Sequence, residues 1–345
     1  MTRILVILLA LLPQVSQSNE TPLGNFYGAQ LSEKPEWFKE SFLEFEEDVA
    51  EARDSGKRVM IYFHQDGCPY CARLVEENFQ NPEIENFVKS NFDGISLNMW
   101  GDREVVSVAG QDFTEKTFAA ALKVQYTPTM IFLDEAGKVA LRLNGYYPPK
   151  DFRAALRFVA GQHEKKMNFS QYRASLEANP SNELIDEDFY IKDRNLQKLV
   201  QQDATPLAVY FETGNCVECT TLHQRILLDE PTRKLVRQMQ NVQLAVHSDE
   251  KIVSPSGVST TMREWAQALD ISYTPSVVFF DETGQEVMRI SGFVKTFHFQ
   301  SVYAYVLEKA YISQPSFQRF IEARADHIRE AGFDTDIWGY QSFHD

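Results

Sequence analysis

The chain has 345 residues, which is too long for one small domain and predicts two or three. Its 43% hydrophobic and 24% charged residues are typical of an ordinary soluble protein. The formal net charge of −15, with no basic cluster to offset it, argues against nucleic acid as a partner. It favours a solvated acidic surface over a specific site for cationic partners.

The first residues predict an export signal. Arg3 is followed by an apolar run that ends at Leu12, and small residues stand at Ser16 and Ser18. We expect a secretory signal peptide over residues 1–18 and a periplasmic or otherwise exported protein. The apolar run is too short for a stable transmembrane helix, although an uncleaved anchor is the alternative.

Helical and strand patterns alternate along the first half of the chain. Apolar residues at helical spacing, Phe42 among them, predict one amphipathic helix from Trp37 to Ala52. The patterns that follow predict a strand at 58–64, helices at 72–79 and 81–89, a strand at 92–99, a helix at 114–122, strands at 130–133 and 138–143, and a closing helix at 151–160.

A pair of cysteines, Cys68 and Cys71, lies between the predicted strand at 58–64 and the helix that follows. A cysteine at a helix start is favoured as a thiolate by the unpaired N–H groups and the helix dipole. The second cysteine, one turn on, can then close the ring and release a product. A disulfide that closes a loop of only two residues restricts the unfolded chain little. The pair is therefore better interpreted as a redox dithiol than as a structural disulfide.

The second half of the chain repeats the first after a shift of about 148 residues. Cys216 and Cys219 repeat the cysteine pair, and a second Tyr-Thr-Pro follows them at nearly the same distance. The repeat predicts two domains rather than a solenoid. The predicted boundaries are a first domain at 35–166, a linker with a short helix at 167–185, a second domain at 186–313, and a C-terminal helix and tail at 314–345 that is either packed on the second domain or loose.

Both halves resemble the thioredoxin superfamily in the order strand, Cys-x-x-Cys helix, strand, helix, Thr-Pro, two strands, helix. The first half further resembles the SoxW-type periplasmic thiol–disulfide proteins through Gly67-Cys68-Pro69-Tyr70-Cys71, Gly101-Asp102-Arg103-Glu104, Thr114-Glu115-Lys116, Tyr126-Thr127-Pro128-Thr129 and Gly145-Tyr146. The resemblance implies an α/β fold with two tandem thioredoxin-like units, each a central mixed sheet flanked by helices.

The resemblance also implies roles for individual residues. Cys68 would be the nucleophile and Cys71 the resolving thiol. Pro128 would be a cis-proline facing the dithiol, with Thr127 offering backbone groups to an extended substrate. By the repeat, the same roles fall on Thr274 and Pro275 and on the second cysteine pair. For both prolines, an ordinary trans turn is the alternative.

The surroundings of the dithiols depart from thioredoxins proper. The buried Asp that thioredoxins carry six residues before the first cysteine is replaced by Tyr62, and by Tyr210 in the second copy. A general reductase role is therefore disfavoured. Pro69, Tyr70 and His64 are expected to tune the first dithiol, with a merely packed strand histidine as the alternative for His64.

The second pair encloses an acidic residue, Glu218. A neighbouring negative charge disfavours a thiolate, so we expect a higher pKa for Cys216 than for Cys68. The second domain is then a relay, a docking module or an inactive copy with a static disulfide. A shared Cys₄ zinc site is disfavoured because each pair has its own fold pattern, so we expect no metal and no cofactor beyond the two disulfides.

The sequence as a whole predicts an exported thiol–disulfide oxidoreductase. Its substrates would be protein thiols and disulfides, exchanged through Cys68 and Cys71 with the second dithiol as a relay or auxiliary site. A reductive role would further require a membrane electron donor. The alternatives are a chaperone or binding module with passive disulfides, and a dedicated electron carrier in sulfur or cytochrome metabolism.

Overall fold

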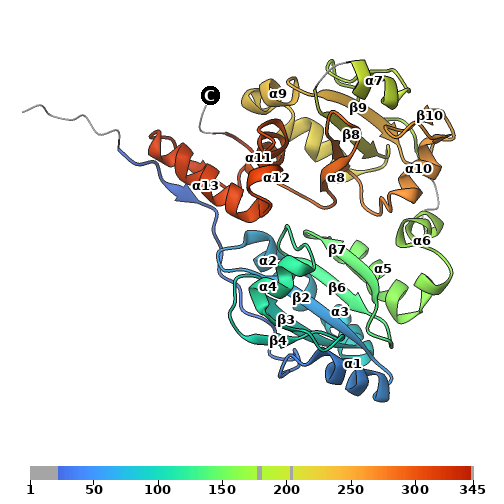
Figure 1. Cartoon of the computed structure of the whole chain (residues 1–345), viewed down its shortest axis with the longest axis vertical. Coiled ribbons are helices and arrows are strands. Elements are labelled where there is room, and N and C mark those ends of the chain that lie inside the picture. Colours follow the sequence, from blue (N-terminus) through green and yellow to red (C-terminus); the bar gives the residue numbers. More distant parts are fainter. Residues whose placement is uncertain (1–21, 177–180, 203–204, 343–345) are drawn as a thin grey trace, which may run out of the picture.

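Two α/β domains follow one another in the computed structural model, which describes residues 22–176, 181–202 and 205–342 (Figure 1). The predicted signal peptide at 1–18 lies outside the described residues, as does part of the predicted linker, 177–180. The two mixed sheets flanked by helices confirm the predicted α/β class and the tandem arrangement.

The first domain is built on a four-stranded sheet in the order β3-β2-β6-β7. Strand β2 runs parallel to β3 and antiparallel to β6. The strands are β2 (Arg58–His64), β3 (Phe92–Asn98), β6 (Thr129–Leu133) and β7 (Val139–Asn144). A short hairpin lies beside them, formed by β4 (Glu104–Val106) and β5 (Asp112–Thr114).

Helices cover both faces of this sheet because β2 is apolar on both sides. Ile61 and Phe63 point to one face, while Met60 and Tyr62 point to the other. The first face carries α1 (Phe45–Asp54) and α4 (Glu115–Ala121). The second carries α2 (Pro69–Leu74), which continues as a π-helical turn over Val75–Phe79, with α3 (Pro82–Asn91) and α5 (Pro149–Ala160).

The second domain repeats this architecture with the sheet order β13-β12-β8-β9. Its strands are β8 (Leu207–Glu212), β9 (Gln240–Ala245), β12 (Ser276–Phe280) and β13 (Glu286–Ile290), with a hairpin of β10 (Lys251–Val253) and β11 (Ser259–Thr261). Its helices are α7 (Leu196–Gln202), α8 (Val217–Thr221), α9 (Glu230–Val236), α10 (Met262–Ala268) and α11 (Thr296–Leu307).

The predicted helix over Trp37–Ala52 is wrong in its first half, because α1 begins only at Phe45. Leu43 has a φ of 65°, in the left-handed region that interrupts a helix. The Leu43 N–H donates a hydrogen bond to the Ser41 hydroxyl oxygen at 2.7 Å, and this bond stabilises a local turn. Phe42, expected on the apolar face, is 95% exposed.

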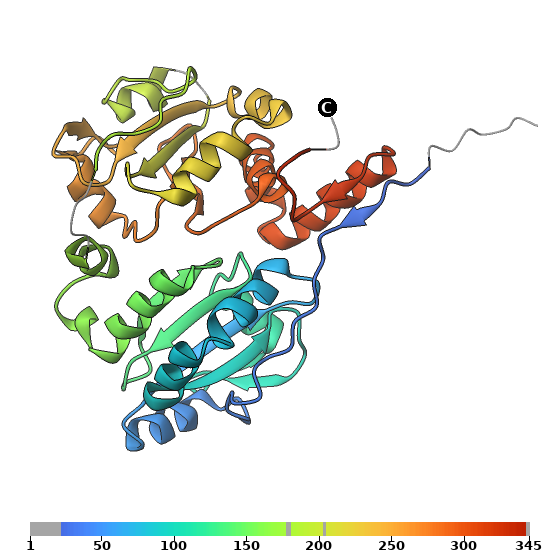
Figure 2. The ribbon, with the colours of Figure 1, turned by 180° about the vertical axis from the view of Figure 1, so that it is seen from behind.

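Two connections join the domains on opposite sides (Figures 1 and 2). On one side lies the linker helix α6 (Phe169–Leu176). On the other, after α12 (Ala310–Ser313), lies the C-terminal helix α13 (Phe317–Glu330), which packs on the core of the second domain. Beside it, β1 (Phe26–Tyr27) pairs in parallel with β14 (Thr335–Asp336), a two-strand contact that we call the terminal clasp.

The domains also meet directly, through equivalent segments of the two repeats. Tyr146 forms a β-bridge with Phe293, and these two residues are equivalent in the repeat, each following a glycine. The preceding glycines touch as well, since a Cβ on Gly292 would lie 2.9 Å from the carbonyl oxygen of Asn144 and 3.5 Å from Cα of Gly145. The interface is therefore pseudo-symmetric at its centre.

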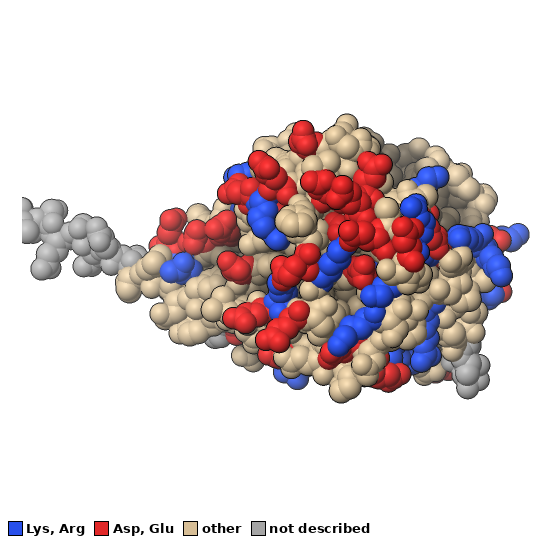
Figure 3. All heavy atoms as spheres, turned by 90° about the horizontal axis from the view of Figure 1, so that it is seen from below, with Lys and Arg blue, Asp and Glu red and all other residues tan. Residues whose placement is uncertain are grey.

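The charged surface is mixed. Figure 3 shows Lys and Arg interleaved with Asp and Glu on the face seen from below. Within the part of the chain that the structure describes, no helix has both the length and the apolar character required to cross a bilayer.

Candidate active site

The first cysteine pair lies where β2 gives way to α2. Gly67, with a φ of 72°, makes the turn between them. Cys68 is the N-cap of α2, and Pro69 occupies the first helical position, where its missing N–H leaves no donor unpaired. The Cys68 and Cys71 sulfur atoms form a disulfide, and the N–H of Cys71 donates to Cys68 Sγ at 3.0 Å.

The predicted Thr-Pro segment lies against this disulfide. The Thr127–Pro128 peptide bond is cis, as the resemblance implied. Cys68 Sγ lies 3.5 Å from the carbonyl oxygen of Thr127, and the Thr127 hydroxyl donates to the same sulfur at 3.4 Å. The fold thus brings together two motifs that lie 59 residues apart in sequence.

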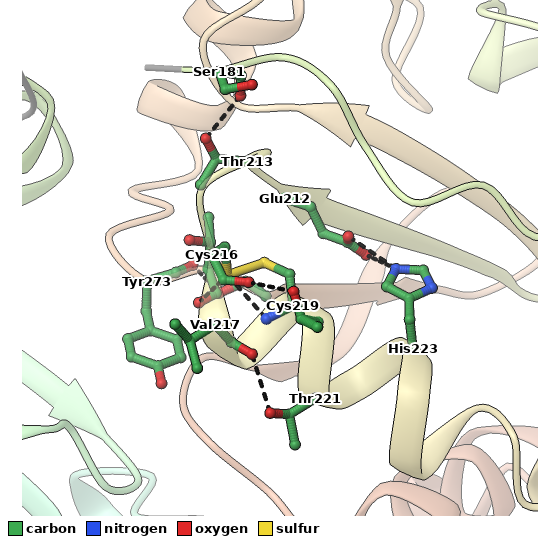
Figure 4. The surroundings of a disulfide bond; sticks show 12 residues. Ser181, Glu212, Thr213, Cys216, Val217, Cys219, Thr221, His223 and Tyr273 are labelled. Atoms are coloured by element: carbon green, nitrogen blue, oxygen red, sulfur yellow. Dashed lines mark hydrogen bonds and ion pairs between the residues drawn. A yellow bond between two sulfur atoms is a disulfide. The ribbon is translucent and has the colours of Figure 1, made fainter. Parts of the chain in front are cut away.

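The second cysteine pair has the same local geometry (Figure 4). Cys216 and Cys219 form a disulfide, and the Cys219 N–H donates to Cys216 Sγ at 2.9 Å. The Thr274–Pro275 peptide is also cis, and the Thr274 carbonyl oxygen lies 3.4 Å from Cys216 Sγ. Among the described residues, however, the Thr274 hydroxyl makes no hydrogen bond to that sulfur, unlike its counterpart in the first domain.

Two predicted tuning residues lie beside the dithiols. His64 is the last residue of β2, and its ring stacks on Tyr62 with centroids 5.4 Å apart. Burial lowers the pKa of His64, against the opposing charge of Asp66, so the ring is a packed, neutral group at neutral pH. Glu218 lines a small cavity of the second domain together with Pro275 and Phe293.

Tyr70, the third predicted tuning residue, is held by the second domain. Its hydroxyl oxygen accepts a hydrogen bond from the Lys295 N–H at 2.8 Å and lies 3.2 Å from Nδ1 of His298. Burial raises the pKa of Tyr70 and lowers the pKa of His298 to about 4. Tyr70 and His298 are therefore both neutral at neutral pH, and their polar atoms meet across the domain boundary.

Sequence reasoning missed a buried histidine between two carboxylates beside the second dithiol. Figure 4 shows Glu212 and His223 directed toward each other, and His223 Nε2 lies 3.0 Å from Glu212. Glu187 lies 3.0 Å from the other ring nitrogen. Burial alone would lower the pKa of His223, but the two carboxylates outweigh it and raise the pKa. The signal was available, since Glu212 is the repeat equivalent of His64.

The Gly101–Glu104 motif forms a turn anchored on a buried carboxylate. Glu115 is 2% exposed, pairs with Arg103 at 2.7 Å and accepts the Asn98 N–H at 2.9 Å. A Cβ on Gly101 would collide with this carboxylate. The motif therefore fixes the loop that carries Trp100 toward the first dithiol.

Metal ligands are not assembled around either pair. Among the residues that the structure describes, no group of three or more His, Cys, Asp or Glu side chains is arranged to hold a metal ion.

Comparison with known families identifies the repeat. A family model described as a thioredoxin-like domain matches residues 45–160 and, separately, residues 194–307. The chain belongs to the thioredoxin-like domain family. Each of the two thioredoxin-like domains contains its own sheet, cysteine pair and cis-proline.

The individual relatives are distant. Anterior gradient protein 3 from Mus musculus is 29% identical over 103 residues, which are 30% of this chain and 54% of that protein. The chain thus spans about half the length of this curated relative. A thioredoxin-fold protein from Helicobacter pylori is 24% identical, with a TM-score of 0.31, and the match covers 37% of this chain and 87% of that one. The DsbH oxidoreductase is 15% identical, with a TM-score of 0.27 and coverage of 39% and 94%.

Proposed function

We propose that this protein is a thiol–disulfide oxidoreductase that exchanges disulfides with protein thiols through Cys68 and Cys71. The observation that carries the proposal is the contact of Cys68 Sγ with the helix start and with Thr127. The sulfur accepts the Cys71 N–H at 3.0 Å and the Thr127 hydroxyl at 3.4 Å. Donors aimed at a sulfur stabilise its thiolate, which is the attacking form.

The exchange runs through a mixed disulfide. In the reduced protein, the Cys68 thiolate attacks a substrate disulfide, and the departing substrate sulfur takes up a proton. Cys71 then loses its proton and attacks Cys68 Sγ, which releases the second substrate thiol and forms the Cys68–Cys71 disulfide. Two electrons pass to the substrate, and the reverse sequence oxidises a substrate dithiol.

Export belongs to the same proposal. A leader over residues 1–18 would deliver the protein to an oxidising compartment, where a reductive role requires a membrane electron donor to restore the dithiol. Cell fractionation of a tagged full chain, with N-terminal sequencing of the exported form, tests this proposal. A protein that stays in the cytoplasm at full length would contradict it.

The second dithiol is proposed as an auxiliary or relay site of the same kind. Cys216 occupies the same N-cap position as Cys68, but it lacks the hydroxyl contact that Thr127 supplies in the first domain. With Glu218 between the cysteines, we expect Cys216 to attack more slowly than Cys68.

The deciding experiment follows thiol exchange with a short peptide disulfide. The wild-type chain should reduce it with dithiothreitol as the terminal reductant, and Cys68→Ser should abolish most of that rate. Cys71→Ala should instead accumulate a mixed disulfide, whose partner mass spectrometry identifies. Unchanged exchange by Cys68→Ser would favour the alternative of a binding module with passive disulfides.

A further inference from the structure

The Cys68–Cys71 disulfide does not lie on an open face of the first domain. It lies at the base of a cavity of about 510 Å³ that both domains line. The base is formed by Cys68, Pro69 and Thr127, and the opposite wall includes Phe297 of α11 and Ile321 of α13. Cys68 is only 4% exposed.

The helix α13 is attached to the first domain and not only to the second. The Gln318 side chain donates to the carbonyl oxygen of Gln125 at 3.1 Å. The Arg319 guanidinium lies over the Trp100 ring, 5.6 Å from its centroid. The cavity wall is therefore held in place on the side that faces the dithiol.

Further contacts between the two domains lie near Cys68. The Tyr146–Phe293 bridge covers the segment that follows β7, and Tyr70 is held by Lys295 and His298. A folded partner needs a broad surface, typically about 800 Å² on each side. The surface around Cys68 is instead a pocket of the size that takes drug-sized ligands.

The lining of the pocket indicates what chemistry fits. Two of its charged side chains are engaged with the protein, since Arg329 donates to the Gly24 carbonyl oxygen at 3.0 Å and pairs with Asp326, while Asp66 and Glu322 also line the pocket. Apolar side chains make up much of the rest, among them Phe26, Tyr126 and Phe297. A peptide segment of apolar residues that carries one cysteine would bury its side chains in this pocket.

We propose that the Cys68 site acts on a cysteine carried by one extended, apolar peptide segment, and that the second domain and α13 exclude disulfides borne on folded surfaces. This inference rests on the proposed exchange activity and names its substrate class. The chemistry is the exchange already written, in which the peptide sulfur forms the mixed disulfide with Cys68 Sγ and its former partner leaves as a thiol.

The test compares three probes that carry the same chromophoric aryl mixed disulfide. One is an eight-residue peptide with its cysteine flanked by Leu and Val, the second has Ser at the flanking positions, and the third is a small folded protein with its cysteine on an exposed helix. Reduced full-length protein is mixed with each probe in a single turnover. We expect the apolar peptide to react at least tenfold faster than either of the others.

Two variants plug the pocket from opposite walls. Ala29 and Glu322 are both exposed residues on its rim, so tryptophan there fills space at small cost to the fold. Ala29→Trp and Glu322→Trp should each slow the apolar peptide at least tenfold. The matched controls Ala109→Trp and Glu330→Trp lie outside the pocket lining and should react like wild type.

The outcomes separate the inference from the function on which it rests. Equal rates with all three probes, or plugged variants as fast as their controls, would overturn the pocket inference while Cys68→Ser still abolished exchange. Exchange that survives Cys68→Ser would instead overturn the proposed function. Far-UV circular dichroism shows whether either tryptophan variant has misfolded. If one has, the rate of the other variant is used for the comparison.

Discussion

At the scale of single residues, the two active sites differ by one hydroxyl contact and by one buried pair. Thr127 donates to Cys68 Sγ, whereas the Thr274 hydroxyl makes no such contact with Cys216 among the described residues. His64 is neutral beside the first dithiol, whereas beside the second His223 lies 3.0 Å from Glu212, which raises the pKa of His223. The duplicated domains are therefore unequal in the groups that can stabilise charge near sulfur.

Replacing Thr127 by Val should weaken the Cys68 thiolate. A hydrogen bond to a charged acceptor contributes about 1.5–3 kcal/mol, so the pKa of the Cys68 thiol should rise by about one to two units. The ultraviolet absorbance of the thiolate, followed during a pH titration of the reduced protein, measures this change. Thr274→Val is the matched control and should leave the titration of Cys216 unchanged. Equal effects of the two variants would contradict the assignment.

Two buried histidines should titrate in opposite directions. The pKa of His223 is raised above 6.5 by Glu212 and Glu187, so its stabilising effect is complete below pH 6.5 and is lost as pH rises through the folded pKa. The pKa of His298 is lowered to about 4 by burial, so stability falls as pH drops from about 6.5 toward 4. NMR titration of the imidazole signals distinguishes the two histidines.

The variant Glu212→Gln should lower the pKa of His223 and leave the pKa of His298 unchanged. A titration midpoint of His223 below 6.5 in the wild-type protein would refute this account.

At the scale of elements, the helix that carries the first dithiol is coupled to the second domain. Tyr70 lies in the first turn of α2, and its hydroxyl bonds Lys295 and His298 at the start of α11. A residue between the two redox cysteines is thus also an interdomain contact. The hydroxyl of Tyr70 therefore links α2 directly to the start of α11.

Tyr70→Phe should loosen this contact between α2 and α11. The change leaves the Lys295 N–H without its acceptor, and a buried unpaired group costs about 1–3 kcal/mol. Urea unfolding should show a loss of stability of that size. Tyr27→Phe removes a hydroxyl from a half-exposed side chain and should be neutral. A Tyr70→Phe protein as stable as wild type would show that the bond contributes nothing net.

At the scale of the whole molecule, the two domains occupy each other's active-site surroundings. The contact is tightest at Gly292, where a Cβ would lie 2.9 Å from the Asn144 carbonyl oxygen. Its backbone φ is not in the left-handed region, so alanine itself is tolerated locally. The glycine is required by the neighbouring domain and not by its own.

Gly292→Ala should therefore push the domains apart without unfolding either. We expect a larger radius of gyration by small-angle X-ray scattering and a several-fold faster reaction of Cys68 with a disulfide on a folded surface. Ser291→Ala, the adjacent change that adds no bulk, is the control. Unchanged scattering with unchanged reactivity would mean that the interface adjusts around the methyl group.

Local motifs and the repeat were sufficient to predict the strands, both cysteine pairs and both Thr-Pro segments. Strand β2 matches its predicted bounds because its apolar run is continuous. The Tyr-Thr-Pro motif, which occurs in both copies, correctly predicted that Thr127 lies beside Cys68. The enclosure of Cys68 was not predictable in this way. The Tyr70–His298 contact joins residues 228 apart in sequence, and no periodicity records such a pairing. The helix predicted from Trp37 similarly failed in its first half, because one side-chain hydrogen bond stabilises a turn at Ser41–Leu43.

The terminal clasp sets an order of events during synthesis. Strand β1 pairs with β14, and Asn25 is bonded to Asp334, 309 residues later. The first domain can complete its own sheet long before residue 334 emerges, so its newly formed dithiol is at first uncovered. The last described segments then close the wall over Cys68. A nascent chain and a finished one should therefore differ in which thiols reach Cys68.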